Sequence, residues 1–123
     1  MINEKVYQSI YDELEGYLPN GWDKLIVYLE YGNDSYSFSF YVKTDGKYTK
    51  CYDLPKISDE ALAKSFSNID KVVLKERKEE KELWSNMTMI VSNEGEMHTD
   101  FDYTDLSEGT YRYKQNWKDK YLI

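Results

Sequence analysis

Apolar side chains recur at every fourth position near the start of the chain, which is the spacing of one face of an α-helix. This pattern predicts an amphipathic helix over residues 3–18 whose apolar face packs into the core. The segment Pro19-Asn20-Gly21 then ends the helix. The predicted face consists of Ile2, Val6, Ile10, Leu14 and Leu18, widened by Tyr7, Tyr11 and Tyr17.

Three segments that follow have the patterns of β-strands. Residues 22–31 form a nearly continuous apolar run, which predicts a strand buried on both faces. Residues 36–43 alternate between apolar and polar side chains, as in a strand with one buried face. Asp45 and Gly46 are typical hairpin residues, so the chain is expected to return in a third strand over residues 48–52.

Helical spacing returns after Ser58, a residue type that caps helix N-termini. The helix is expected to continue into a charged run at residues 75–82, where lysine, arginine and glutamate alternate. We interpret that run as the solvated end of the helix, stabilised by pairs of opposite charge four residues apart. The expected buried face of this helix is Leu62, Phe66, Ile69 and Val73.

The most informative stretch covers residues 84–106, which is typical of two strands around a turn at residues 92–95. Each strand alternates, so each is expected to have one buried and one solvent-exposed face. Trp84 and Tyr103 are assigned to the core. The other buried side chains are Met87, Met89, Val91, Met97, Thr99 and Phe101, and the exposed face of the second strand carries Glu96, His98, Asp100 and Asp102.

The last seventeen residues place Thr110, Tyr113, Trp117 and Tyr121 on one helical face and are basic where the rest of the chain is acidic. A short docked helix is expected there. The order of elements is then α-β-β-β-α-β-β-α. It predicts a single α+β domain over residues 1–123, with one antiparallel sheet of about five strands and the helices packed on one face.

Composition limits the function classes. The net charge is −7, and an acidic surface repels nucleic acid and anionic lipid, so direct binding to either is disfavoured. The 13 tyrosines supply contact area for a protein interface as well as for a core. The N-terminal residues lack the apolar segment of a signal peptide, and no later run is long enough to span a bilayer, so a soluble cytoplasmic protein is expected.

The residues that could perform chemistry are few. His98 is the only histidine, and same-face residues of one strand lie roughly 7 Å apart, too far for Asp100 and Asp102 alone to share a metal ion. Cys51 is the only cysteine and has no histidine near it in sequence, so we interpret it as a sheet cysteine. The sequence predicts no catalytic residues, no metal and no cofactor.

Several segments together resemble one known family. They are Pro19 to Lys24 at the first helix-to-strand junction, Asp53-Leu54-Pro55 before the second helix, Trp84, the turn Asn93 to Glu96, the run Asp100 to Asp105, and the closing Trp117 to Leu122. In this order and spacing they resemble the YezG-like (EsaG-like) immunity proteins over nearly the whole chain. The chain differs at Asp119, where the family commonly has a tyrosine-rich stretch, and at Ile123, where relatives often continue.

The resemblance implies a cytoplasmic antitoxin that neutralises the C-terminal domain, often a nuclease, of a polymorphic toxin exported by a type VII secretion system of Gram-positive bacteria. It implies no catalytic residues. We expect an acidic surface to occupy the basic cleft of the toxin, and the free protein to be a monomer or weak dimer. The expected partner-binding residues are Glu96, Asp100, Asp102 and Asp105 for charge, and Tyr113 and Trp117 as anchors if the core does not bury them.

Three alternatives stay open at this point. The acidic residues on the exposed face of the second hairpin strand, Glu96, Asp100 and Asp102, could serve only to keep that face of the sheet soluble. The tyrosine-rich sheet could form a small-molecule or peptide-binding pocket, which an enclosed apolar cavity would favour. The carboxylates could also bind a divalent ion in a hydrolase.

Overall fold

The computed structural model of the chain describes residues 4–32, 35–55, 57–107 and 109–123. Across these described residues, three α-helices and five strands follow one another in the predicted order, with two short 3-10 helices between them. The elements are α1 (Glu4–Leu14), η1 (Glu15–Tyr17), β1 (Lys24–Tyr31), β2 (Tyr36–Thr44), β3 (Lys47–Lys50), η2 (Cys51–Asp53), α2 (Asp59–Arg77), β4 (Asn86–Ser92), β5 (Met97–Asp102) and α3 (Tyr111–Tyr121).

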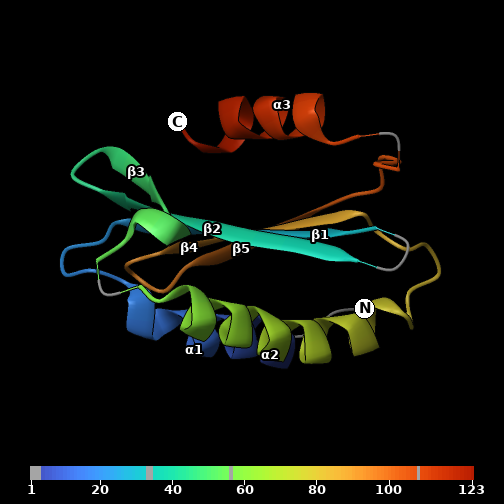
Figure 1. The fold of residues 1–123 in the computed structure, drawn as a ribbon, viewed down its shortest axis with the longest axis horizontal. Helices are drawn as coiled ribbons and strands as arrows, with labels where there is room; N and C mark the ends of the chain where they lie inside the picture. Colours follow the sequence, from blue (N-terminus) through green and yellow to red (C-terminus); the bar gives the residue numbers. More distant parts are fainter. Residues whose placement is uncertain (1–3, 33–34, 56, 108) are drawn as a thin grey trace.

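The strands form one open antiparallel sheet in the order β3-β2-β1-β4-β5. The α+β class and the single five-stranded antiparallel sheet predicted from the sequence are therefore confirmed. The position of one helix is not. Figure 1 shows α1 and α2 on one face of the sheet and α3 on the other, so the helices occupy both faces rather than one.

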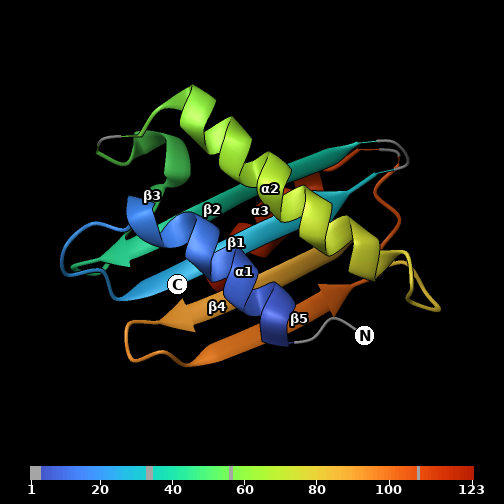
Figure 2. The ribbon, with the colours of Figure 1, turned by 90° about the horizontal axis from the view of Figure 1, so that it is seen from below.

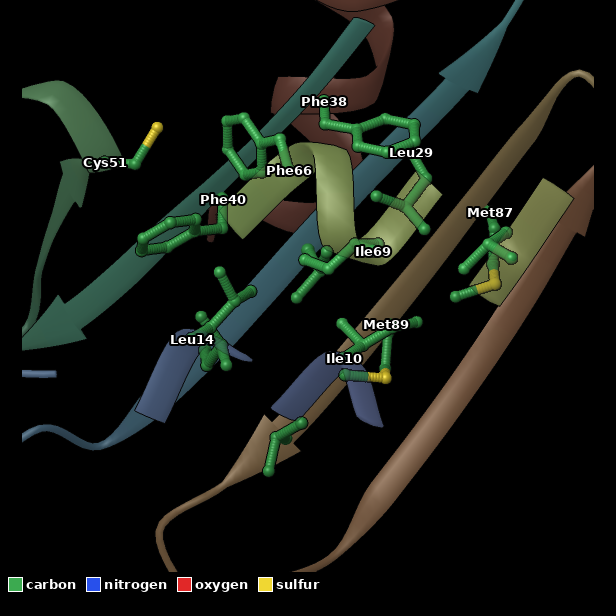
Figure 3. Close-up of a cluster of buried hydrophobic side chains, with 14 of the residues drawn as sticks. Ile10, Leu14, Leu29, Phe38, Phe40, Cys51, Phe66, Ile69, Met87 and Met89 are labelled. Carbon is green, nitrogen blue, oxygen red and sulfur yellow. The ribbon is translucent and has the colours of Figure 1, made fainter. Parts of the chain in front are cut away.

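The main core lies between the sheet and the helices α1 and α2 (Figure 3). Alternate residues of β1 and β4, together with Phe38, Phe40 and Val42 of β2, face these helices and are buried. Tyr36 and Met97 were expected on the same buried face and are instead 41% and 40% exposed. Ile10 and Leu14 of α1, together with Phe66 and Ile69 of α2, are also buried in the main core. Ile2, which the sequence placed on the same stripe, lies outside the described residues.

Two hairpins have the predicted turns. Asp45 and Gly46 have φ angles of 51° and 78°, and this left-handed pair joins β2 to β3 with the twist that a two-residue hairpin requires. At the β4–β5 turn the Gly95 amide donates to the Ser92 carbonyl, and the Ser92 amide donates to the Glu96 carbonyl at 2.9 Å. Gly95 has a φ of 89°, so the turn is a three-residue loop with a bulge at the glycine.

Ser58 caps α2 as predicted, because its hydroxyl accepts a hydrogen bond from the Ala61 amide at 3.1 Å. We expect Ser58→Ala to lower the free energy of unfolding by about 1 kcal/mol, since that amide would lose its partner in the first turn. Urea denaturation measures the change. A loss below about 0.3 kcal/mol would contradict the assigned cap, and Ser58→Asp, which keeps an acceptor, is the matched control.

Other elements end earlier than the sequence predicted. The first helix stops at Leu14 and continues only as the 3-10 turn η1, instead of reaching residue 18. Similarly, α2 ends at Arg77, so most of the charged run at residues 75–82 lies beyond the helix. The run has no apolar side chain to bury, and helices in proteins depend on such burial.

Tyr103 was assigned to the core and is instead 54% exposed. The Asp102 carboxylate accepts a hydrogen bond from the Thr104 amide, and this turn ends β5 before Tyr103. By contrast Trp84, also assigned to the core, is buried.

Candidate functional site

The helix α3 packs on the second face of the sheet through Trp117, which is only 5% exposed. The Trp117 ring meets the Tyr28 ring edge-on, at 4.9 Å between centroids, and lies 5.6 Å from that of Tyr41. Its indole N–H donates a hydrogen bond to the Thr88 hydroxyl at 2.9 Å. Because the ring is buried and its polar atom is paired, Trp117 fixes α3 to the sheet.

A short polar chain continues beneath Trp117. The Thr88 hydroxyl donates to the Asn86 side-chain oxygen at 3.0 Å, and the Asn86 side-chain nitrogen donates to the Leu29 carbonyl at 3.2 Å. All three side chains are buried, and these bonds satisfy the polar groups that burial would otherwise penalise.

Two carboxylates of β5 hold the tyrosines of α3. The Tyr121 hydroxyl donates to Asp100 Oδ2 at 2.7 Å, and the Tyr113 hydroxyl donates to Asp102 Oδ2 at 2.8 Å. The remaining oxygens are also bonded. Asp100 Oδ1 lies 2.8 Å from His98 Nε2, and Asp102 Oδ1 accepts from the Thr104 hydroxyl and amide. Both carboxylates are therefore part of the internal structure.

This arrangement changes an expectation from the sequence. Asp100 and Asp102 were placed on a solvent-exposed face of the sheet, but α3 covers that face and both residues are only partly exposed. Charged residues can lie there because tyrosine hydroxyls donate to them. The other two residues predicted on that face, Glu96 and His98, are exposed.

The hydrogen bonds keep both carboxylates ionised. Partial burial opposes ionisation of Asp100, but hydrogen bonds from Tyr121 and His98 outweigh it and hold the pKa of Asp100 below its usual value. The pKa of Asp102 is lowered in the same way, by bonds from Thr104 and Tyr113. Burial and the bond to Asp100 raise the pKa of Tyr121 to about 12, so the tyrosine stays a donor at neutral pH.

These pKa values predict an acid-sensitive attachment of α3. A carboxylate whose pKa is lowered by folding stabilises the fold fully above its unfolded value of about 4, and this contribution is lost as the pH falls through the folded value. We expect the melting temperature of the wild type to fall more steeply below pH 4 than that of the double variant Asp100→Asn, Asp102→Asn. Melting curves between pH 2 and pH 7 measure both slopes, and parallel curves would contradict the prediction.

The structure brings four of the six predicted partner-binding residues into one place. Asp100, Asp102, Tyr113 and Trp117 line a cleft of about 400 Å³ between α3 and β5. Its lining is largely polar, with Asn86, Asn116 and Lys120 beside the two carboxylates, which does not fit the enclosed apolar pocket of a small-molecule module. Trp117 is buried there, so it positions α3 and offers little surface to a partner.

The other two predicted residues lie elsewhere. Glu96 is exposed where the β4–β5 turn meets β5. Asp105 is exposed after the end of that strand, where it accepts a hydrogen bond from the Ser107 amide. It lines a second cleft of about 470 Å³ together with Tyr103 and Leu83, two large side chains that are both more than half exposed.

Three residues of this site were not predicted from the sequence. Tyr121 was placed on the correct helical face but was not linked to Asp100, because that pair is 21 residues apart. Thr88 and Asn86 alternate with the buried methionines of β4, so the sequence pattern did place them on the opposite face of that strand. The signal that could have found them is the continuous burial predicted for β1, which requires a covering layer on each face of the sheet.

Among the described residues no group of three or more histidine, cysteine or acidic side chains could hold a metal ion. Cys51 lies in the 3-10 turn η2 and not in a strand, which corrects its assignment as a sheet cysteine. It is buried in the main core, and burial raises the pKa of its thiol, so a reactive thiolate is disfavoured. None of the described helices has the length and apolar character that a membrane span requires.

The sequence profile of the family described as "Immunity protein YezG-like" matches residues 3–122. Two curated proteins, each named Immunity protein YezG, are similar over most of the chain. The one from Bacillus spizizenii is 24% identical over 110 residues, covering 82% of this chain and 68% of its own length. The one from Bacillus subtilis is 24% identical over 112 residues, covering 84% of this chain and 74% of its own length. The chain therefore belongs to the family of YezG-like immunity proteins.

Proposed function

We propose that this protein is an antitoxin that binds the C-terminal domain of a toxin secreted by the type VII route, and that this domain is a nuclease. Family membership over residues 3–122 is the observation that carries the immunity role. Binding takes place in the cytoplasm of the producing cell, where the toxin would otherwise reach nucleic acid. The protein itself neither catalyses a reaction nor binds nucleic acid.

The charge distribution supports a basic partner. Residues 85–111 contain six carboxylates and neither lysine nor arginine, in a chain whose net charge is −7. A nuclease must bind phosphates, and a basic cleft that does so also attracts a row of carboxylates. Charge complementarity of this kind raises the association rate and favours the right class of partner.

We assign different parts to the four predicted acidic residues. Glu96 and Asp105 are exposed and can meet a partner directly. Asp100 and Asp102 add negative charge beside them, while their hydrogen bonds to Tyr121 and Tyr113 hold the α3 surface in place. The toxin cleft would then be occupied by the β4–β5 hairpin in place of the phosphate backbone.

The test is co-purification with the toxin domain encoded beside this gene, followed by assays of the complex on DNA and on RNA. We expect a stable complex and loss of nuclease activity at equimolar antitoxin, with a toxin domain from another system as the control that is neither bound nor inhibited. A failure to bind, or full activity in the presence of saturating antitoxin, would overturn the proposal. Inhibition of a toxin with another activity would overturn only the nuclease part.

A further inference from the structure

We propose that the open edge of β5 receives an extended basic strand of the toxin domain, which thereby adds a sixth strand to the sheet. This inference rests on the proposed function, because it names the part of the toxin that the antitoxin recognises. Figure 2 shows β5 along one side of the sheet, and within the described residues β4 is the only strand that pairs with it. The edge is six residues long, from Met97 to Asp102.

The hydrogen-bond register shows which backbone groups face outward. The Ser92 amide donates to the Glu96 carbonyl, and the pairing continues with Ile90 opposite His98 and Thr88 opposite Asp100. In an antiparallel pair, residues alternate between exchanging hydrogen bonds with the neighbour and pointing their N–H and C=O groups away from it. The outward groups are therefore those of Met97, Thr99 and Phe101, and no strand of the described residues pairs with them.

This edge lacks two features that commonly prevent strand addition, namely proline and lysine. Proteins protect edges with proline, with lysine or by making the strand short. The opposite edge strand, β3, has only four residues and begins and ends with Lys47 and Lys50. In contrast, β5 contains no proline, lysine or arginine. The charges that β5 does carry, Asp100 and Asp102, repel an acidic strand and attract a basic one, so this edge can serve as a template for a basic strand.

The side chains of β5 specify what kind of strand fits. On the α3 face an added strand would lie beside Asp100 and Asp102, with Glu96 at one end, so basic side chains suit that face. Asp102 Oδ1 already accepts two hydrogen bonds, but Asp102 Oδ2 and both oxygens of Asp100 have one partner each among the described residues and can accept another. On the opposite face lie Met97, which is 40% exposed, and the half-buried Phe101, so apolar side chains suit that face.

This pattern favours the toxin over a second copy of the chain. In a two-fold antiparallel pairing centred on Thr99, Glu96 of one copy would lie opposite Asp102 of the other, and each copy carries a net charge of −7. Like charges directly opposite each other destabilise strand pairing. A toxin strand that alternates basic and apolar residues carries no such penalty.

Residue-resolved amide hydrogen exchange, followed by NMR, tests the inference on the wild type. In the free protein the amides of Met97, Thr99 and Phe101 should exchange fast, while those of His98 and Asp100 are protected by β4. In the complex with the toxin domain we expect the three outward amides to slow by about tenfold or more. Residues 36–40 of β2 are uncharged and are not paired with β3, so they form a second open edge. The exchange rates of their amides should not change when the toxin domain binds, and they serve as the internal comparison.

A pair of variants tests the same edge through affinity. Thr99→Pro removes one outward amide and places a ring at the edge, where proline is tolerated by the fold. Thr99→Val keeps the amide, and both variants lose the side-chain hydrogen bond that Thr99 makes with Tyr7. We expect the proline variant to raise the Kd for the toxin domain at least about tenfold over the valine variant, because it removes a main-chain bond and blocks the approach.

The outcomes separate this inference from the proposed function. The toxin domain could be bound and inhibited while the three outward amides exchange as in the free protein. That result would overturn strand addition at the β5 edge but would still support the antitoxin role. Protection that appears without toxin, as the concentration of the protein alone is raised, would identify a second copy and also overturn addition of a toxin strand. A toxin domain that the wild type does not bind would overturn both.

Discussion

Trp117→Ala is expected to lower the free energy of unfolding by about 3–5 kcal/mol, a large share of the stability of a domain of this size. The ring is almost fully buried and contacts Tyr28, Tyr41 and Tyr121, so its removal leaves a cavity beneath α3. It also leaves the Thr88 hydroxyl without its donor. Urea denaturation measures the loss, and hydrogen exchange in α3 reports whether the helix detaches.

Two further variants separate the contributions of the ring and of the hydrogen bond. Trp117→Phe keeps an aromatic ring but loses the indole donor, and we expect it to cost clearly less than the alanine variant. Thr88→Val removes the acceptor while Trp117 keeps its packing, and it should cost about 1–2 kcal/mol. A loss below about 1 kcal/mol for Trp117→Ala would show that α3 is held mainly by its tyrosines and not by this anchor.

The stability of α3 also bears on recognition. Tyr113 and Tyr121 are held by Asp102 and Asp100, the same residues that would present negative charge to a toxin strand at the edge of β5. A variant that releases α3 would therefore change the surface next to that edge as well as the stability. For this reason charge reversal at Asp100 or Asp102 cannot by itself assign them to the interface, whereas asparagine keeps an acceptor for each tyrosine.

Local sequence patterns predicted the elements because each depends on neighbours close in the chain. Local periodicity does not depend on contacts with distant segments. Examples are the alternation in residues 36–43 and the helical spacing of Leu62, Phe66, Ile69 and Val73. The hairpin turns at Asp45-Gly46 and Gly95 were predicted for the same reason, since they depend only on backbone conformation.

What the sequence did not predict depends on contacts between distant segments. The sequence pattern predicts that Asp100 and Asp102 are solvent-exposed. Their hydrogen-bond partners, Tyr121 and Tyr113, come 21 and 11 residues later in the chain, so no local pattern reveals them. The sequence did predict burial of β1 on both faces, and Ile26 and Tyr28 need a cover on the second face. The C-terminal helix, which is basic and aromatic, is the element that covers this face. No local sequence pattern connects the C-terminal helix with the second face of β1, so its position was not predicted.

Reversing the two exposed glutamates of the β4–β5 turn is expected to slow binding to the toxin domain. Glu94 and Glu96 are solvent-exposed, and at this turn their main-chain amides, not their carboxylates, bond to the Ser92 side chain. The double variant Glu94→Lys, Glu96→Lys should therefore keep the fold. We expect its association rate to fall about tenfold or more at low salt, because steering by complementary charge is lost. Stopped-flow kinetics or surface plasmon resonance at several salt concentrations measure the rate.

A control with the same change in net charge separates local from overall electrostatics. Glu79 and Glu82 are exposed and lie before β4, at the opposite end of that strand from the turn. If the toxin binds beside the turn, Glu79→Lys, Glu82→Lys should change the association rate much less. The difference between the two double variants should shrink as salt rises, since the screening length falls from about 10 Å at 0.1 M to about 3 Å at 1 M. Equal slowing in both would mean that only the total charge of the antitoxin attracts the toxin, and the hairpin would lose its assigned role in recognition.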